Sequence, residues 1–236
     1  NTKKMNVDDI ILATSSNTEN LKLKEFAEKH DIKFIQGSEN NLFQRCNDVV
    51  KNLNLTDNDY ILRMTADDVC RSYEIANDII SFCKNENEIY DYVSHYPKEC
   101  PTGLGSEIIS VQSIKYFNEL LKEDNEHLTF YYLAFKNKMK LKIINLDKKY
   151  NFDSTITLDT EEDYNNLNKF FAKCEINNEA VDFNKVKDYF MVNKMEESKV
   201  CMGDSPDKTI ELLNNQCKKY DGYTPINDIY EEISRL

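Results

Sequence analysis

The sequence is short of the residues that phosphate-binding and membrane motifs use most. It has five glycines among 236 residues, and none lies in a Gly-x-Gly-x-x-Gly or Walker-type loop, so a standard glycine-rich phosphate cradle is excluded. No apolar run approaches the roughly 20 residues of a membrane-spanning helix. No leader-like pattern opens the chain, whose first nine residues are mostly polar. We therefore expect neither a membrane protein nor a secreted one.

Cysteine and histidine motifs for metals are also missing. The seven cysteines are scattered and odd in number, and none are spaced as Cys-x-x-Cys. The three histidines do not cluster with them, which argues against a zinc site. Scattered cysteines on apolar faces indicate reduced, mostly buried thiols and a cytoplasmic protein.

The charge balance limits the partners that the protein can bind. A net charge of −12 disfavours broad contacts to a phosphate backbone, so we expect no nucleic-acid partner. An acidic protein can still bind a nucleotide where a metal ion and a few local cations neutralise its phosphates. With 40% hydrophobic residues, the chain can form a sizeable core.

Short apolar runs alternate with apolar stripes of helical spacing along most of the chain. This order predicts right-handed crossovers and a mostly parallel sheet, and therefore an α/β fold. The run at residues 108–111 is predicted as an edge strand. The other predicted strands are residues 7–14, 33–36, 60–64, 89–94, 141–146 and 155–158.

The composition changes after Cys174. The remaining residues are polar and acidic and contain no clear strand. We predict an α/β domain at residues 1–174 and a helical C-terminal extension at residues 175–236. Short helices are predicted within that extension at residues 186–192, 209–218 and 226–233.

The organising stretch is the apolar run at residues 60–64, which leads directly into Asp67 and Asp68. The carboxyl ends of strands in open α/β sheets are where ligands bind. Asp159 follows another predicted strand, so both acids can reach one crevice. Two carboxylates with phosphate oxygens suit an octahedral Mg²⁺ site. The alternative interpretation is helix capping at both positions.

Three further stretches are candidates for binding. Residues 37–45 are either part of a nucleotide site or a plain strand-to-helix turn capped by Ser38 or Asn40. Residues 101–107 are either functional or a loop with two positive-φ glycines. His127, within Glu-His-Leu-Thr, is either functional or a structural histidine at a helix start.

In chain order these stretches resemble one enzyme family. The family motifs are a second strand (here residues 7–15), a turn and helix (37–45), Arg-x-Thr-Gly-Asp (63–67), Pro-x-Gly-hydrophobic…Glu (101–107), Glu-His-Val-Thr (126–129) and Asp-Thr-x-x-Asp (159–163). Each motif is weak alone. Together, over residues 7–172, they resemble the cytidylyltransferases that activate acidic sugars, namely SpsF-type spore-coat polysaccharide proteins and acylneuraminate and 3-deoxy-manno-octulosonate cytidylyltransferases.

The resemblance implies a Rossmann-like three-layer nucleotidyltransferase fold. It also implies transfer of CMP from CTP to a nonulosonic-acid-like sugar acid for surface glycan synthesis, with Mg²⁺ as cofactor. The implied partners are CTP, an acidic sugar and a second copy of the chain in a homodimer. Asp67 and Asp159 would be the catalytic residues and metal ligands. The implied nucleotide-binding residues are Ser15, Gly37, Ser38, Asn40, Arg45, Arg63 and Thr65, and the implied sugar-binding residues are Gly103, Glu107 and His127.

The sequence departs from the family pattern in two places. The family opens with a strand and a basic loop, Arg-x-x-Ser-x-Arg-Leu-Pro-x-Lys, which has no counterpart here; the sequence is then either a fragment or a member that does not bind CTP normally. Ala66 replaces the usual glycine, and Val69 the usual proline. Two alternatives stay open: a GT-A-type nucleotide-sugar glycosyltransferase, and a non-catalytic binding or scaffold module.

Overall fold

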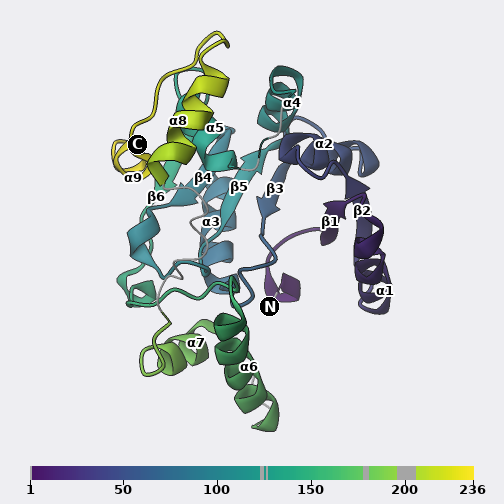
Figure 1. The fold of residues 1–236 in the computed structure, drawn as a ribbon, viewed down its shortest axis with the longest axis vertical. Helices are drawn as coiled ribbons and strands as arrows, with labels where there is room; N and C mark the ends of the chain where they lie inside the picture. Colours follow the sequence, from purple (N-terminus) through teal and green to yellow (C-terminus); the bar gives the residue numbers. More distant parts are fainter. Residues whose placement is uncertain (1, 123–124, 126, 178–180, 196–205) are drawn as a thin grey trace.

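The computed structural model describes residues 2–122, 125, 127–177, 181–195 and 206–236. Its strands form two sheets (Figure 1). A two-stranded parallel sheet pairs Ser15 at the end of one strand with Gly37 at the end of the other. A four-stranded sheet has the order β3-β5-β4-β6. The strands are β1 (Ile11–Ser15), β2 (Lys33–Gly37), β3 (Tyr60–Arg63), β4 (Tyr92–His95), β5 (Glu107–Ser110) and β6 (Leu141–Ile144).

Strand β5 runs against its neighbours and lies inside the four-stranded sheet. It is antiparallel to both β3 and β4, whereas β4 and β6 are parallel. Strands β3, β4 and β6 therefore share one direction, which confirms a mostly parallel α/β fold. The prediction of an edge strand at residues 108–111 was wrong. All four β5 residues are buried between two strands, and Val111 already begins a helix because Ser110 caps it.

Residues 155–158 form no strand, which corrects a second prediction. They make an isolated bridge, Thr155 to Thr102, and Ile156 N donates to Thr102 O at 2.8 Å. Within the part of the chain that the structure describes, the stretch therefore bonds to an irregular loop and to no sheet strand. The helices are α1 (Leu21–Lys29), α2 (Leu42–Asn52), α3 (Tyr73–Asn85), α4 (Val111–Leu120), α5 (Leu128–Ala134), α6 (Glu161–Ile176), α7 (Phe183–Phe190), α8 (Pro206–Cys217) and α9 (Ile229–Ser234).

Side chains at the helix starts explain several of these boundaries. Ser72 caps α3, so the capping interpretation of Asp67 and Asp68 was wrong. Thr160 and Asp163 form the capping box predicted for α6. The side chains of Ser72 and Thr160 each accept a hydrogen bond from a backbone N–H group that the first helical turn leaves without a partner.

The four-stranded sheet separates two apolar cores, which gives the three-layer arrangement. Adjacent strand residues point to opposite faces, and Tyr92 and Val93 accordingly belong to different cores. Helices α2, α4, α5, α8 and α9 contribute to the core with Tyr92, and α3, α6 and α7 to the core with Val93. Among the described residues, no helix is both long and apolar enough to cross a membrane.

Helices beyond residue 174 belong to both cores. Phe183 and Phe190 of α7 pack beside α3 and α6, whereas Leu213 and Cys217 of α8 join the core around α5. Figure 1 shows the two groups at opposite ends of the molecule. The domain boundary at residue 174 stays a prediction.

The six described cysteines are free thiols, and five of them are buried. Burial raises the pKa of the Cys46 thiol to about 11 and that of Cys70 to about 12. These thiols therefore stay protonated at neutral pH and act as small apolar side chains. Cys201 lies outside the described residues.

We expect Phe117→Ala to destabilise the fold strongly. Phe117 is fully buried and its ring stacks on that of Phe43 at 4.7 Å between centroids. Loss of a buried phenylalanine costs about 3–5 kcal/mol, which urea unfolding would measure. Phe26→Ala is the matched control because Phe26 is 52% exposed on α1. Equal losses in the two variants would contradict the assignment of this core.

Candidate functional site

Three segments that are distant in sequence meet beyond the end of β3. They are the turn at residues 64–72, the loop at residues 101–107 and the segment at residues 155–159. Leu158 N donates to Asp67 O at 2.9 Å, which joins the first to the third. Ser72 N donates to Leu104 O at 3.2 Å, which joins the first to the second. Backbone hydrogen bonds therefore fix all three segments relative to one another.

Asp67 and Asp159 lie next to this backbone bond, and both are exposed. Among the described residues, the Asp67 carboxylate makes no hydrogen bond or ion pair, and Asp159 Oδ2 accepts from Thr157 Oγ1 at 2.5 Å. Asp67 O is bonded to the residue that precedes Asp159, so no layer of core separates the two acids. They are hard oxygen donors open to solvent, which are the ligands that Mg²⁺ takes from proteins.

The protein supplies few ligands at this position. In the described part of the chain, no group of three or more histidine, cysteine, aspartate or glutamate side chains could hold a metal ion. Mg²⁺ is commonly held by one or two carboxylates, with water and substrate phosphates completing its shell. Asp67 and Asp159 fit that pattern. They do not fit a metal site whose ligands all come from the protein.

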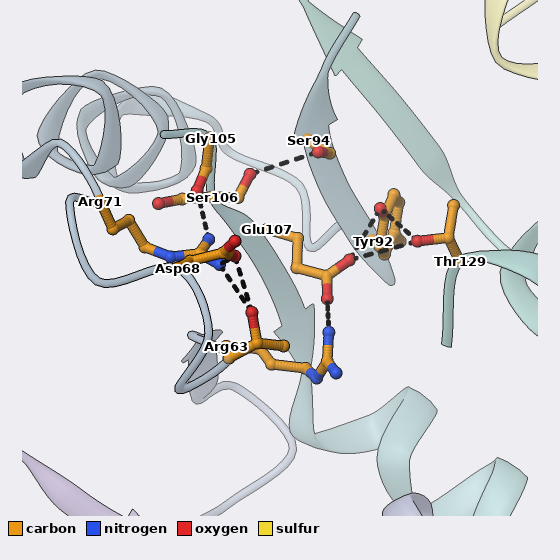
Figure 2. A network of polar contacts seen from close by, with 10 residues as sticks. Arg63, Asp68, Arg71, Tyr92, Ser94, Gly105, Ser106, Glu107 and Thr129 are labelled. Atoms are coloured by element: carbon orange, nitrogen blue, oxygen red, sulfur yellow. Dashed lines mark hydrogen bonds and ion pairs between the residues drawn. The ribbon is translucent and has the colours of Figure 1, made fainter. Parts of the chain in front are cut away.

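Asp68, the neighbour of Asp67, has a different environment. Its carboxylate forms an ion pair with Arg71 and accepts from Thr65 Oγ1 at 2.6 Å (Figure 2). The Asp68 side chain is 15% exposed and that of Arg71 is 7% exposed. Burial raises the pKa of Asp68, although Arg71 and Thr65 act against the rise, and burial lowers the pKa of Arg71.

A second, partly buried ion pair crosses from β3 to β5. Arg63 Nη1 donates to Glu107 Oε1 at 2.6 Å, and the other carboxylate oxygen accepts from the Tyr92 hydroxyl at 2.9 Å (Figure 2). Thr129 Oγ1 lies 3.4 Å from the same oxygen. Burial acts to lower the pKa of Arg63, but the charge and hydrogen bond of Glu107 outweigh it and raise that pKa.

A comparison with known families identifies the family of this chain. A family model described as cytidylyltransferase matches residues 1–200. The chain belongs to the cytidylyltransferase family. The match continues beyond residue 172, where the sequence motifs end. Family and fold support a CTP-using nucleotidyltransferase and favour it over the glycosyltransferase alternative.

Individual relatives are distant. An uncharacterized protein of Methanocaldococcus jannaschii is 26% identical over 188 residues, which cover 77% of this chain and 74% of its own. A solved cytidylyltransferase from Leptospira borgpetersenii serovar Hardjo-bovis has a TM-score of 0.66 and 20% identity, covering 80% of this chain and 79% of that one. A 4-diphosphocytidyl-2C-methyl-D-erythritol synthase from Anaerococcus prevotii has a TM-score of 0.48 and 15% identity, covering 72% and 84%. The Leptospira structure shows the fold that the two proteins share.

The ends of β1 and β2 hold part of the predicted nucleotide site. Ser15 and Gly37 pair there. A Cβ on Gly37 would lie 2.8 Å from Asp48 Oδ2 and 3.2 Å from Arg45 Cα, so glycine permits the close approach of α2. Ser15 is buried, and its Oγ accepts from Asn20 Nδ2 at 2.7 Å.

The turn after β2 differs from prediction in its cap. Asn41, and neither Ser38 nor Asn40, caps α2, because its side chain accepts from Gln44 N at 2.8 Å. Ser38 Oγ accepts from Asn41 N at 3.1 Å, and Arg45 Nη1 donates to Ser38 O at 3.2 Å. Asn40 is exposed on the same turn. These contacts order the turn that carries Ser38 and Asn40, whereas Arg63 and Thr65 of the predicted nucleotide site lie at and beyond the end of β3.

The predicted sugar-binding residues differ in their surroundings. Gly103 has φ +92°, and a Cβ there would lie 2.1 Å from Ile156 O. Gly105 has no positive φ, contrary to prediction; a Cβ there would instead lie 1.9 Å from His95 Nε2. Glu107 uses both carboxylate oxygens within the protein. His127 is exposed before α5, and within the described residues its side chain makes no hydrogen bond or ion pair with this cluster. Glu126 of the same motif lies outside the described residues.

Three residues of the cluster were not predicted as site residues from the sequence. Arg71, Tyr92 and Thr129 complete the two ion-pair networks. Arg71 and Tyr92 stand in no recognisable motif, whereas Thr129 ends the Glu-His-Leu-Thr stretch. A buried ion pair requires hydrogen bonds from further side chains. That requirement could have suggested that partners for Arg63 and Asp68 exist, but not which residues they are.

We expect Glu107→Gln to lower the free energy of unfolding by about 1.5–3 kcal/mol, the usual range for a hydrogen bond to a charged group. The variant leaves the partly buried Arg63 guanidinium without its countercharge. Urea unfolding measures the loss. Lys115→Gln is the control, because its ion pair with Asp57 is exposed at 41% and 64% and should contribute less than about 1 kcal/mol. A Glu107→Gln variant whose free energy of unfolding is unchanged would refute a stabilising role for this ion pair.

Proposed function

We propose that this protein is a Mg²⁺-dependent cytidylyltransferase that transfers CMP from CTP to a sugar acid of the nonulosonic kind, for surface glycan synthesis. The observation that carries the proposal is the hydrogen bond from Leu158 N to Asp67 O. This bond joins the backbone segments that carry the exposed Asp67 and Asp159, in a chain of the cytidylyltransferase family. The proposal includes a homodimer in the cytoplasm, where CTP is made.

The proposed reaction is a direct displacement at phosphorus. A hydroxyl oxygen of the sugar acid forms a bond to the α-phosphorus of CTP, and the bond from that phosphorus to the bridging oxygen breaks. Pyrophosphate leaves, and the hydroxyl proton passes to solvent. No protein nucleophile is required. A Mg²⁺ ion held by Asp67 and Asp159 would neutralise charge on the phosphate oxygens and align the attacking and leaving groups.

The other residues contribute binding and orientation. Arg63 and Thr65 stand at the end of β3, and we assign them, with Ser15, Gly37, Ser38, Asn40 and Arg45, to the nucleotide. Gly103, Glu107 and His127 are assigned to the sugar. Glu107 would act through Arg63, because its own oxygens are already bonded within the protein. Since positioning and electrostatic stabilisation supply most of the catalysis of phosphoryl transfer, these held side chains suit the proposed reaction.

We expect Asp67→Asn and Asp159→Asn each to reduce turnover by about a hundredfold or more, which is the usual loss on removal of one group that stabilises developing charge. Both side chains are exposed, so the variants should remain folded, as circular dichroism would check. Asp221→Asn is the control, because that side chain is 94% exposed in a remote ion pair with Lys138. Near-normal turnover in either folded site variant would refute the metal assignment.

Substrate use is tested by pyrophosphate release with each of the four nucleoside triphosphates and a panel of sugar acids, with and without Mg²⁺. We expect release with CTP and a sugar acid, and its loss when the metal is chelated. A non-catalytic module would give no release with any combination. Light scattering in the same buffer would test the homodimer.

A further inference from the structure

Arg71 lies at the centre of the contacts that fix the turn after β3. Its guanidinium pairs with Asp68, donates to Thr65 Oγ1 at 3.2 Å and donates to the carbonyl oxygen of Gly105 (Figure 2). Arg71 is 6% exposed. One side chain therefore ties both ends of the turn to each other and to the loop at residues 101–107.

The turn fixed in this way carries Asp67, and the two neighbouring acids have opposite environments. The Asp68 carboxylate is held within the protein by Arg71 and Thr65. The Asp67 carboxylate is exposed and makes no hydrogen bond or ion pair within the described residues. Because the two residues are adjacent, holding the Asp68 side chain in place also fixes the backbone position of Asp67. The arrangement divides a pair of like residues into one anchor and one available ligand.

The loop that Arg71 grips is also attached to the segment that carries Asp159. Ile156 N donates to Thr102 O, and Gly103 lies so close to Ile156 O that a Cβ would overlap it. Asp159 is thus linked to Arg71 by two routes, one through Asp67 and Leu158 and one through the loop. Movement of the Arg71 side chain would loosen both routes.

We propose that Arg71 is a positioning residue for the metal site, and that its three-way contact sets the separation of Asp67 and Asp159. The inference rests on the proposed function, because it requires these acids to bind a divalent cation. Arg71 itself touches neither the cation nor the substrate. Its role requires a guanidinium, since a planar fork of donors can reach three acceptors at once, whereas a lysine ammonium offers a single nitrogen.

The test measures metal binding without turnover. Mn²⁺ replaces Mg²⁺, CTP is present, the sugar acid is omitted, and free Mn²⁺ is counted by electron paramagnetic resonance. Loss of a residue that orients a metal ligand typically costs about 10- to 100-fold in metal affinity. We expect a weakening in that range for Arg71→Lys. In turnover assays we expect the Mg²⁺ activation curve to shift to higher concentration by a similar factor.

Two further variants separate positioning from a general loss of stability. Lys136→Met removes another partly buried ion pair, with Glu232 on α9, and should lower the unfolding temperature without changing the affinity for Mn²⁺. The double variant Asp68→Asn with Arg71→Gln removes both charges together, so no uncompensated charge stays buried. We expect the double variant to fold and still to bind Mn²⁺ weakly.

The outcomes distinguish this inference from the function on which it rests. If Asp67→Asn loses Mn²⁺ while folded Arg71→Lys and the double variant bind it within twofold of the original protein, the positioning role is overturned and the proposed function stands. If Asp67→Asn binds Mn²⁺ normally, the metal site is overturned and the positioning role with it. Equal weakening by Lys136→Met would also overturn the positioning role, because stability alone would then explain the effect.

Discussion

The hydrogen bond from Leu158 N to Asp67 O is the contact on which the candidate site depends. It joins residues that are 91 positions apart, and neither belongs to a regular element. Closing so long a loop costs conformational entropy, which the contact alone cannot offset. The segments are held because Ile156 also bonds to Thr102 and because α6 begins immediately afterwards with a capping box. The arrangement of the segments that carry Asp67 and Asp159 therefore depends on hydrogen bonds between irregular segments more than on the sheet.

Local chemistry was predictable from the sequence, and spatial order was not. The capping box at Thr160 and Asp163 could be read from residue types three apart, as could the apolar stripes of most helices. The place of β5 could not, because a buried apolar run looks the same at an edge and in the centre of a sheet. The prediction of a strand at residues 155–158 was wrong for a related reason. An alternation of apolar and polar residues indicates which side chains face inward. The same alternation occurs in an extended segment that bonds to a loop and not to another strand.

The site shows the same limit at the level of single residues. Asp67 and Asp68 are chemically identical, and the family resemblance alone distinguished them in advance. The structure separates them by environment, since Asp68 has a buried arginine beside it and Asp67 faces solvent. The partner that decides this difference, Arg71, reaches a carbonyl 34 residues away at Gly105. No periodicity or spacing rule encodes such a contact, because it depends on where the chain returns.

Two arginines, the buried Arg71 and the partly buried Arg63, hold the loop at residues 101–107 at neighbouring points. Arg71 bonds to the carbonyl of Gly105, and Arg63 pairs with Glu107. Replacing a buried ion pair by apolar groups is often neutral or stabilising, so stability alone is a weak reason for two such pairs here. Orientation of the loop is a better reason for them. Directional hydrogen bonds at Gly105 and Glu107, together with the close packing of Gly103 against Ile156, leave the loop few conformations. A loop ordered before its ligand arrives loses less entropy on binding, and groups held in advance stabilise developing charge without reorganising. Asp68 and Arg71 follow Asp67 on its turn, and Arg63 ends the strand before it, so the two pairs order the backbone on both sides of that acid.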